Sequence, residues 1–249
     1  MVRPPRWAGL SDRGQVRERN EDCWSADADL GLFIVSDGMG GRPAGEVASE
    51  VVVAALPTLV AHHFSAEPDL AAPDAPQRLR TVLTELSAEV REGSQDTPRL
   101  AGMGATAVAA LVSASQATAL IAHVGDSRAY LLRERSLHRL TRDHSLAQAL
   151  IDAGAITDQQ AAGHPARGQL TRHMGMAGEV SPDARRVALQ PDDRLLLCSD
   201  GLTGMLDDAQ IQAILNRSSD PQHACRALTE AANDAGGIDN ITVLVIAPA

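Results

Sequence analysis

The feature that most constrains this chain is an apolar segment that ends in Ser-Asp-Gly and occurs twice. The copies are LFIVSDGMGG at residues 32–41 and LLLCSDGLTG at residues 195–204. A short apolar run bounded by glycine is typical of a buried strand, so each copy predicts a strand that ends on a placed carboxylate, Asp37 or Asp200. The following glycine lets the backbone turn and brings its carbonyl close to whatever the carboxylate holds. Two such carboxylates predict one shared site for a hard divalent cation.

Strands and helices are expected in separate blocks. Apolar runs between polar breaks predict strands at residues 7–10, 23–33, 105–112, 118–124, 129–132, 137–140, 185–189, 194–199 and 241–246. Apolar residues at helical spacing predict helices at residues 44–64, 76–93, 143–154, 157–162, 208–217 and 220–235. Pro57 is expected to bend or interrupt the first helix.

The order of these blocks predicts the fold class. The polar breaks between residues 105 and 140 are of turn length, which predicts an antiparallel meander. Strands lie at the start, middle and end of the chain, and paired helices occupy two separate blocks. This arrangement favours an α+β fold, a four-layer α-β-β-α sandwich of two antiparallel sheets flanked by helix pairs.

Length and composition limit the class of protein. A chain of 249 residues suits one large sandwich, so a single domain over residues 1–249 is expected. The net charge of −10 and the pI near 5.2 disfavour a surface for nucleic acid or for an anionic membrane. The three cysteines lack CxxC spacing, which indicates neither a disulfide framework nor a thiolate zinc site. Because no apolar signal region follows the N-terminus and no charge-free segment is long enough to span a bilayer, we expect a soluble, cytoplasmic monomer.

Five aspartates share a setting at the edge of an apolar strand: Asp22, Asp37, Asp126, Asp200 and Asp239. Gathered carboxylates repel one another, so they either take up protons or hold cations. Few arginines lie nearby in the sequence, which favours a metal. Two divalent cations a few ångströms apart can share a hydroxide that attacks phosphorus, and Arg17 could then bind the substrate phosphate.

Each assignment has a simpler alternative. Any single Asp-Gly pair is also a common turn dipeptide. Arg17 could instead neutralise a neighbouring glutamate. His123 is expected to be a packed or hydrogen-bonded histidine rather than a ligand. Ser36 and Ser199 are poor candidates for a nucleophile because neither lies in a G-x-S-x-G elbow.

A series of short motifs runs in a fixed order between residues 11 and 246. These motifs are Arg17-x-x-Asn20-Glu21-Asp22, Asp37-Gly38-Met39-Gly40-Gly41 with Gly45-Glu46, Gly102-x-Gly104-Ala105-Thr106, Gly125-Asp126-Ser127-Arg128, Thr141-x-Asp143-His144-Ser145, Leu170-Thr171-Arg172, Ser199-Asp200-Gly201 and Asp239-Asn240. In this order they resemble the motifs of bacterial metal-dependent PPM (type 2C) Ser/Thr protein phosphatases. The resemblance implies a double antiparallel β-sandwich flanked by helix pairs. It also implies hydrolysis of phosphoserine and phosphothreonine in proteins by a metal-bridging water, opposing a Ser/Thr kinase.

The resemblance implies two tightly bound manganese or magnesium ions and a third, weaker one. Asp37 would bridge the two central ions, and Gly38 would contribute its carbonyl. Asp200 and Asp239 would bind one of these two ions.

The remaining site residues follow from the same resemblance. Asp22, with Glu21 acting through water, would bind the other central ion. Asp126 would join Asp200 at the third ion, and Arg17 matches the arginine that binds the substrate phosphate.

Two positions bear on mechanism and substrate choice. Many eukaryotic members carry a histidine, proposed as general acid, where this chain and many bacterial relatives have Met39. The segment at residues 147–168 matches the flap that varies between relatives and shapes substrate choice. Two other classes remain open, a catalytically silent module that binds metal or a phosphorylated partner, and a metal-dependent nuclease or phosphodiesterase. The acidic composition disfavours the nuclease.

Overall fold

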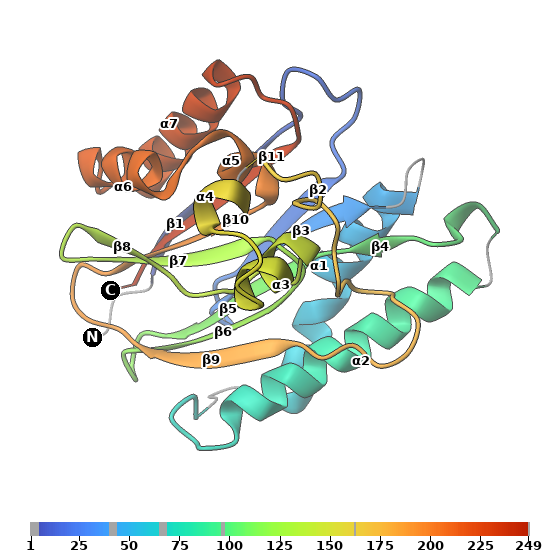
Figure 1. The fold of residues 1–249 in the computed structure, drawn as a ribbon. Helices are drawn as coiled ribbons and strands as arrows, with labels where there is room; N and C mark the ends of the chain where they lie inside the picture. The colour runs from blue at the N-terminus through green and yellow to red at the C-terminus, as the bar shows by residue number, and fades with distance from the viewer. Residues whose placement is uncertain (1–4, 40–43, 65–68, 96–97, 162, 249) are drawn as a thin grey trace.

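The computed structural model describes residues 5–39, 44–64, 69–95, 98–161 and 163–248, and its strands form two sheets (Figure 1). The five-stranded sheet has the order β1 (Arg6–Asp12), β11 (Ile241–Ala247), β10 (Arg194–Cys198), β7 (Arg128–Arg133) and β8 (Ser136–Arg139). The six-stranded sheet has the order β2 (Asp22–Asp27), β3 (Leu32–Met39), β5 (Ala107–Ser113), β6 (Thr118–Val124) and β9 (Asp183–Ala188), with β4 (Gly104–Ala105) paired to β3. The pairings are antiparallel. The predicted positions Gly40, Gly41 and Ala162 lie outside the described residues.

Helices cover the outer face of each sheet (Figure 1). The six-stranded sheet is covered by α1 (Ala44–His63) and α2 (Ala75–Gln95), and the five-stranded sheet by α5 (Asp200–Met205), α6 (Asp208–Arg217) and α7 (Pro221–Asp234). Three apolar clusters fill the spaces between the layers, one between the sheets and one beneath each helix layer. The predicted four-layer sandwich is confirmed. The shorter helices are η1 (Pro98–Leu100), α3 (Leu146–Asp152) and α4 (Asp158–Ala161).

Strand β3 shows why the apolar run of the first Ser-Asp-Gly copy is continuous. Leu32 and Ile34 pack beneath the α1–α2 layer, whereas Phe33 and Val35 pack between the two sheets. Successive side chains of a strand point to opposite faces, so a strand that is buried on both faces needs apolar residues at every position. The strand can therefore hold Asp37 firmly at its end.

The single strand predicted at residues 23–33 is wrong, because this segment is the β2–β3 hairpin. The side chain of Asp27 closes the turn, and its Oδ1 accepts hydrogen bonds from the backbone N–H groups of Asp29 at 3.0 Å and Leu30 at 2.9 Å. Gly31 follows with φ +68°, and a Cβ there would lie 2.2 Å from the carbonyl oxygen of Val112. This polar turn is short and is flanked by apolar residues on both sides, so the sequence pattern does not reveal it.

The predicted meander is also wrong, since its four strands form two hairpins in different sheets. The β5–β6 hairpin belongs to the six-stranded sheet and the β7–β8 hairpin to the five-stranded sheet. The chain changes sheets at Gly125, Asp126 and Ser127, where Gly125 has φ +103°. This turn carries Asp126 to the end of the sandwich.

Helix α1 runs through Pro57 without the interruption that was one of the two predicted effects of this proline. It is long and apolar enough, by length and composition alone, to cross a membrane. In the fold, Ala48, Val52, Leu56 and Val60 form its buried stripe and pack on the six-stranded sheet and α2. A helix that forms one wall of a core has the same composition.

Candidate functional site

Loops at one end of the sandwich enclose a cleft of about 520 Å³. Its described lining residues are Arg17, Glu18, Arg19, Glu21, Asp37, Gly38, Met39, Thr106, Asp126, Gly168, Leu170, Asp200, Asp239 and Asn240. They come from the β1–β2 loop, β3, the residue between β4 and β5, the β6–β7 turn, the segment between α4 and β9, the start of α5 and the residues just before β11. The fold thus brings Asp37, Asp126, Asp200 and Asp239 to one cleft with Arg17, which is 222 residues from Asp239 in the chain.

A chain of buried hydrogen bonds links Asp37 to the turn that carries Asp126. The backbone N–H of Asp37 donates to Thr106 Oγ1 at 3.0 Å, and Thr106 N–H donates to the carbonyl oxygen of Asp37 at 2.8 Å. Thr106 Oγ1 and Ser127 Oγ share a hydrogen bond of 2.6 Å. Thr106 and Ser127 are both buried, so this link holds the two carboxylates of different loops at a fixed separation.

Close backbone contacts explain the glycine that follows Asp37. The N–H of Gly38 donates to the carbonyl oxygen of Glu21 at 3.1 Å. A Cβ on Gly38 would lie 2.1 Å from the carbonyl oxygen of Gly45, and one on Gly45 would lie 2.7 Å from Glu21 Oε2. Because these two positions are glycines, the end of β3, the start of α1 and the Glu21 segment can pack directly on one another, and no larger residue would fit.

The second Ser-Asp-Gly copy leads into a short helix, α5, which the sequence did not predict. Asp200 is its first residue, and a Cβ on Gly201 would lie 1.9 Å from the carbonyl oxygen of Asn240. The Asn240 side chain in turn accepts from the Glu21 N–H at 2.8 Å and donates to the Arg19 carbonyl at 2.7 Å. Asn240 therefore holds the segments that carry Asp200, Glu21 and Arg17 in fixed positions relative to one another.

The cleft is strongly acidic. Its described lining contains six acidic residues and two basic ones, namely Glu18, Glu21, Asp37, Asp126, Asp200 and Asp239 against Arg17 and Arg19. Burial, followed by the charges of neighbouring carboxylates, raises the pKa of Asp37 and of Asp126 well above the ordinary value, and it also raises the pKa of Asp200. A hard divalent cation would relieve this repulsion, so the residues present fit a metal centre.

Arg17 lies at the mouth of the cleft beside Asp239. Its Nη2 donates to Asp239 Oδ2 at 2.6 Å, and this hydrogen bond is the main cause of the raised pKa of Arg17. The guanidinium is half-exposed, so it can contact a solute that enters the cleft. An arginine in this position suits an anion such as phosphate.

Asp22 lies beneath the cleft, directly opposite Asp37 in the β2–β3 register. Its Oδ2 accepts a hydrogen bond from Ser199 Oγ at 2.6 Å, while its buried Oδ1 has no partner among the described residues. Burial raises the pKa of Asp22 to about 7, against the hydrogen bonds from Ser199 and Thr242. The unpartnered oxygen fits a cation or its bound water. Direct metal ligation by Asp22 stays a prediction.

A family model described as protein phosphatase 2C matches residues 12–234 of the chain. The chain belongs to the protein phosphatase 2C family. Its similar relatives include the serine/threonine phosphatase stp of Listeria monocytogenes, 38% identical over 95% of this chain and 93% of that protein. Another is the serine/threonine protein phosphatase PstP of Mycobacterium tuberculosis, 39% identical over 96% of this chain and 44% of that longer protein.

Solved structures agree with this family membership. The crystal structure of M. tuberculosis PstP/Ppp superposes with a TM-score of 0.86 at 36% identity and covers 99% of both chains. A crystal structure of the PstP catalytic domain in complex with two manganese ions superposes with a TM-score of 0.83 at 34% identity, covering 98% of this chain and 97% of that one. The PPM phosphatase MsPP of Mycobacterium smegmatis, in complex with cacodylate, gives a TM-score of 0.82 at 38% identity and 98% coverage of both chains.

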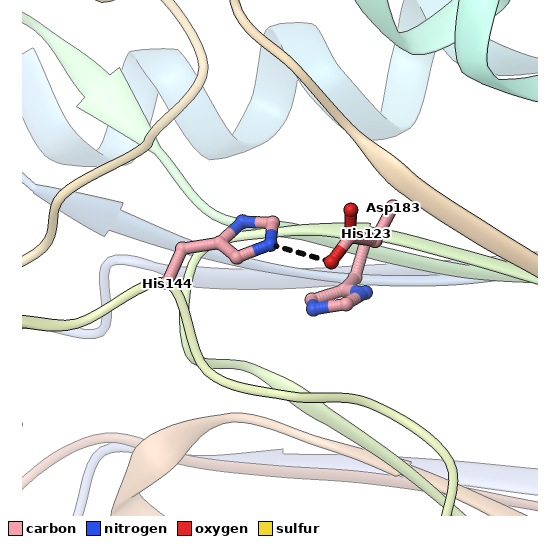
Figure 2. Close-up of side chains that lie close together, drawn as sticks. All are labelled: His123, His144 and Asp183. Carbon is pink, nitrogen blue, oxygen red and sulfur yellow. Dashed lines mark hydrogen bonds and ion pairs between the residues drawn. The ribbon is translucent and has the colours of Figure 1, made fainter. Parts of the chain in front are cut away.

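This member of the family also contains a second group of metal-ligand types, His123, His144 and Asp183, whose ligand atoms lie within 4.8 Å of one another (Figure 2). His144 Nδ1 accepts from the Gly125 N–H at 3.2 Å, and His144 Nε2 lies 3.2 Å from Asp183 Oδ2 and 3.1 Å from Arg172 Nη1. Burial and the neighbouring His123 lower the pKa of His144 to about 4, which keeps the ring neutral.

Hydrogen bonds account for this histidine group. The ring of His123 stacks on that of His144 with 4.5 Å between centroids, and His123 Nε2 bonds the Arg142 carbonyl oxygen at 2.8 Å. The backbone N–H of His144 also donates to the Gly125 carbonyl at 2.9 Å. The group therefore fastens the segment before the flap to the turn that carries Asp126.

Sequence reasoning missed the polar residues that position the family's carboxylates. Thr106, Ser127 and Asn240 lay within recognised motifs, but no role was assigned to them. The sequence raises Ser199 only as a poor candidate for a nucleophile, whereas its buried hydroxyl donates a hydrogen bond to Asp22. The signal was present, since a hydroxyl or amide directly beside a placed aspartate at a strand end has few other partners.

Proposed function

We propose that this protein is a metal-dependent phosphatase that removes phosphate from phosphoserine and phosphothreonine in proteins. The observation that carries the proposal is the gathering of four aspartates and Arg17 in one cleft. Membership of the protein phosphatase 2C family supports it, as do the names of relatives from Listeria and Mycobacterium. We further propose that it acts on the products of a Ser/Thr kinase, as a cytoplasmic monomer. Its three free cysteines suit a reducing compartment.

The carboxylate cluster would hold the metal ions. Asp37 and the Gly38 carbonyl, with Asp200 and Asp239, would hold two manganese or magnesium ions, and Asp126 would contribute to a third, weaker one. When bound, such ions supply a hydroxide near neutral pH and neutralise charge on the phosphoryl oxygens. Two manganese ions in the related PstP catalytic domain support the choice of manganese.

The chain's own residues bind and orient the substrate. Arg17 holds the phosphate through its guanidinium N–H groups, which match two phosphate oxygens. Asp239 accepts from Arg17 at 2.6 Å and so keeps the guanidinium at the mouth of the cleft before substrate arrives. In the overall reaction, one water is consumed: its oxygen bonds phosphorus, the P–O bond to the serine or threonine breaks, and a proton from that water completes the free serine or threonine hydroxyl.

Phosphate release from a phosphothreonine peptide and from p-nitrophenyl phosphate tests this function. We expect turnover of both with added manganese and none after treatment with a chelator, with recovery when manganese is restored. Metal binding without turnover of either compound would instead favour a catalytically silent module. Turnover of a bis-aryl phosphodiester in preference to both would favour a phosphodiesterase.

Arg17→Ala is expected to lower kcat/KM on p-nitrophenyl phosphate about 10- to 100-fold, mostly through KM, because a hydrogen bond to a charged group contributes about 1.5–3 kcal/mol. The manganese titration should change little, since Arg17 touches the substrate rather than the ions. Arg19→Ala is the matched control. Arg19 lines the same cleft and pairs with Glu46 at 3.6 Å. A larger KM effect for Arg19→Ala would transfer the phosphate role to Arg19.

A further inference from the structure

Two exposed apolar side chains lie on the segments that carry the Arg17–Asp239 pair. Among the described residues, the large apolar side chains that are exposed are Trp7 at 37%, Leu146 at 38%, Ile238 at 57% and Val16 at 64%. The two most exposed, Val16 and Ile238, come from distant parts of the chain, yet each directly neighbours a member of the Arg17–Asp239 pair.

The two segments run side by side. The N–H of Gln15 donates to the carbonyl oxygen of Gly237 at 2.7 Å, and two residues further on Arg17 bonds Asp239 at 2.6 Å. Val16 and Ile238 occupy the positions between these two contacts. The two exposed apolar residues therefore lie on adjacent backbone segments, each next in sequence to a member of the Arg17–Asp239 pair, and we call this pair of residues the rim.

This rim is held in place by its backbone. A Cβ on Gly14 would lie 2.2 Å from the Asp239 carbonyl oxygen, and one on Gly237 would lie 2.8 Å from Gln15 Cγ. Asn240 Nδ2 also donates to the Arg13 carbonyl at 2.9 Å. More than half of each side chain is exposed to solvent, and apolar side chains on a well-held loop suit a surface that loses little entropy on binding.

We propose that Val16 and Ile238 form a docking rim for an apolar side chain of the phosphorylated substrate, one or two residues from the phosphoserine or phosphothreonine. The proposal rests on the proposed function. An extended peptide advances about 3.3 Å per residue, and adjacent Cα atoms are about 3.8 Å apart, so a peptide anchored by its phosphate at Arg17 brings its near neighbours over the rim. The acidic residues beside the rim, Glu18 and Asp239, would repel an anionic membrane surface.

The test uses phosphothreonine peptides in which one position from −2 to +2 carries either Leu or Ser. We expect the native protein to prefer Leu at one or two of these positions. Val16→Ser and Ile238→Ser should each lower kcat/KM for the preferred Leu peptide about 5- to 10-fold through KM, as partial loss of one aliphatic contact implies. In the double variant, the ratio of kcat/KM between the Leu and Ser peptides should approach one.

Conservative variants serve as the matched control. Val16→Ile and Ile238→Val keep an apolar surface and should keep the Leu preference. Leu146→Ser, at an exposed apolar residue that neighbours neither Arg17 nor Asp239 in the chain, should keep it as well.

Three outcomes would overturn the docking rim. In the first, the native protein has the same kcat/KM for the Leu and Ser peptides. In the second, the double variant retains the preference for Leu. In the third, the variants lose as much kcat/KM on p-nitrophenyl phosphate as on the peptides, which would make the rim a support for Arg17. Turnover of p-nitrophenyl phosphate with none of any phosphopeptide is a distinct result, because it removes the proposed protein substrate and the rim's role together.

Discussion

Asp37→Asn is expected to abolish turnover and, at the same time, to stabilise the metal-free protein. Turnover should fall at least about 1,000-fold, because bound ions supply several kcal/mol of transition-state stabilisation and each 1.36 kcal/mol is tenfold in rate. Without metal, the amide removes one charge from a cluster whose members raise one another's pKa. The melting temperature at pH 8 should therefore rise by about 2–4 °C, which corresponds to roughly 1 kcal/mol.

The pH dependence of stability gives the same prediction a second readout. Burial and neighbouring carboxylates raise the folded-state pKa of Asp37, Asp126 and Asp200, and they raise that of Asp22 to about 7. The folded state binds these protons more tightly than the unfolded state does. The protonated carboxyl groups therefore add to the free energy of unfolding in full below about pH 4, and this added stability is lost as the pH rises through the folded-state pKa values. Asp37→Asn should flatten this loss in the metal-free protein.

With manganese bound, the native protein should become more stable than Asp37→Asn, the reverse of the order expected without metal. At 100-fold excess over its Kd, a ligand adds about 2.7 kcal/mol of stability, and Asp37→Asn should lose most of this gain. Asp152→Asn is the control, since Asp152 is an exposed partner of Arg142 and does not line the cleft. Normal turnover by Asp37→Asn, or an undiminished manganese effect on its melting temperature, would contradict the role of Asp37 as a shared ligand.

The site could be predicted from the sequence where one short segment determines both the strand and the side chain at its end. The first four residues of strand β3 are apolar because both its faces are buried, so the end of this apolar run and Asp37 were visible together. The same holds for β10 and Asp200. The fold class followed from the order of such segments.

The parts of the fold and of the site that were not predicted depend on contacts between segments that are far apart in the sequence. The pairing of β5 with β6 and of β7 with β8 in different sheets depends on one turn at Gly125, whose positive φ the sequence does not reveal. The hydrogen bond between Ser199 and Asp22 joins residues 177 positions apart. No local pattern encodes such a partner, so the residues that support the carboxylates could not be assigned.

Gly201 shows how a contact of this kind can be tested, because a neighbouring glycine in the same helix provides the control. Both Gly201 and Gly204 lie in α5, but only Gly201 meets another backbone, with its Cβ position 1.9 Å from the Asn240 carbonyl oxygen. At Gly204 an added Cβ would find open space. Gly201→Ala should therefore force α5 and Asn240 apart, whereas Gly204→Ala should gain helix propensity, up to about 1 kcal/mol.

The expected loss for Gly201→Ala is about 1–3 kcal/mol of stability, the usual cost of overpacking, together with about a 100-fold fall in kcat/KM. The rate falls because Asp200 precedes Gly201 and Asp239 precedes Asn240, so separating the two backbones moves two carboxylates of one cluster apart. Thermal unfolding, a manganese titration and p-nitrophenyl phosphate kinetics on both variants measure each part. If Gly201→Ala matched Gly204→Ala in activity and metal affinity, the close approach would be a packing detail that does not set the distance between Asp200 and Asp239. A loss of metal affinity in Gly201→Ala alone would instead show that this single backbone contact holds the two Asp-containing loops in register for the ions.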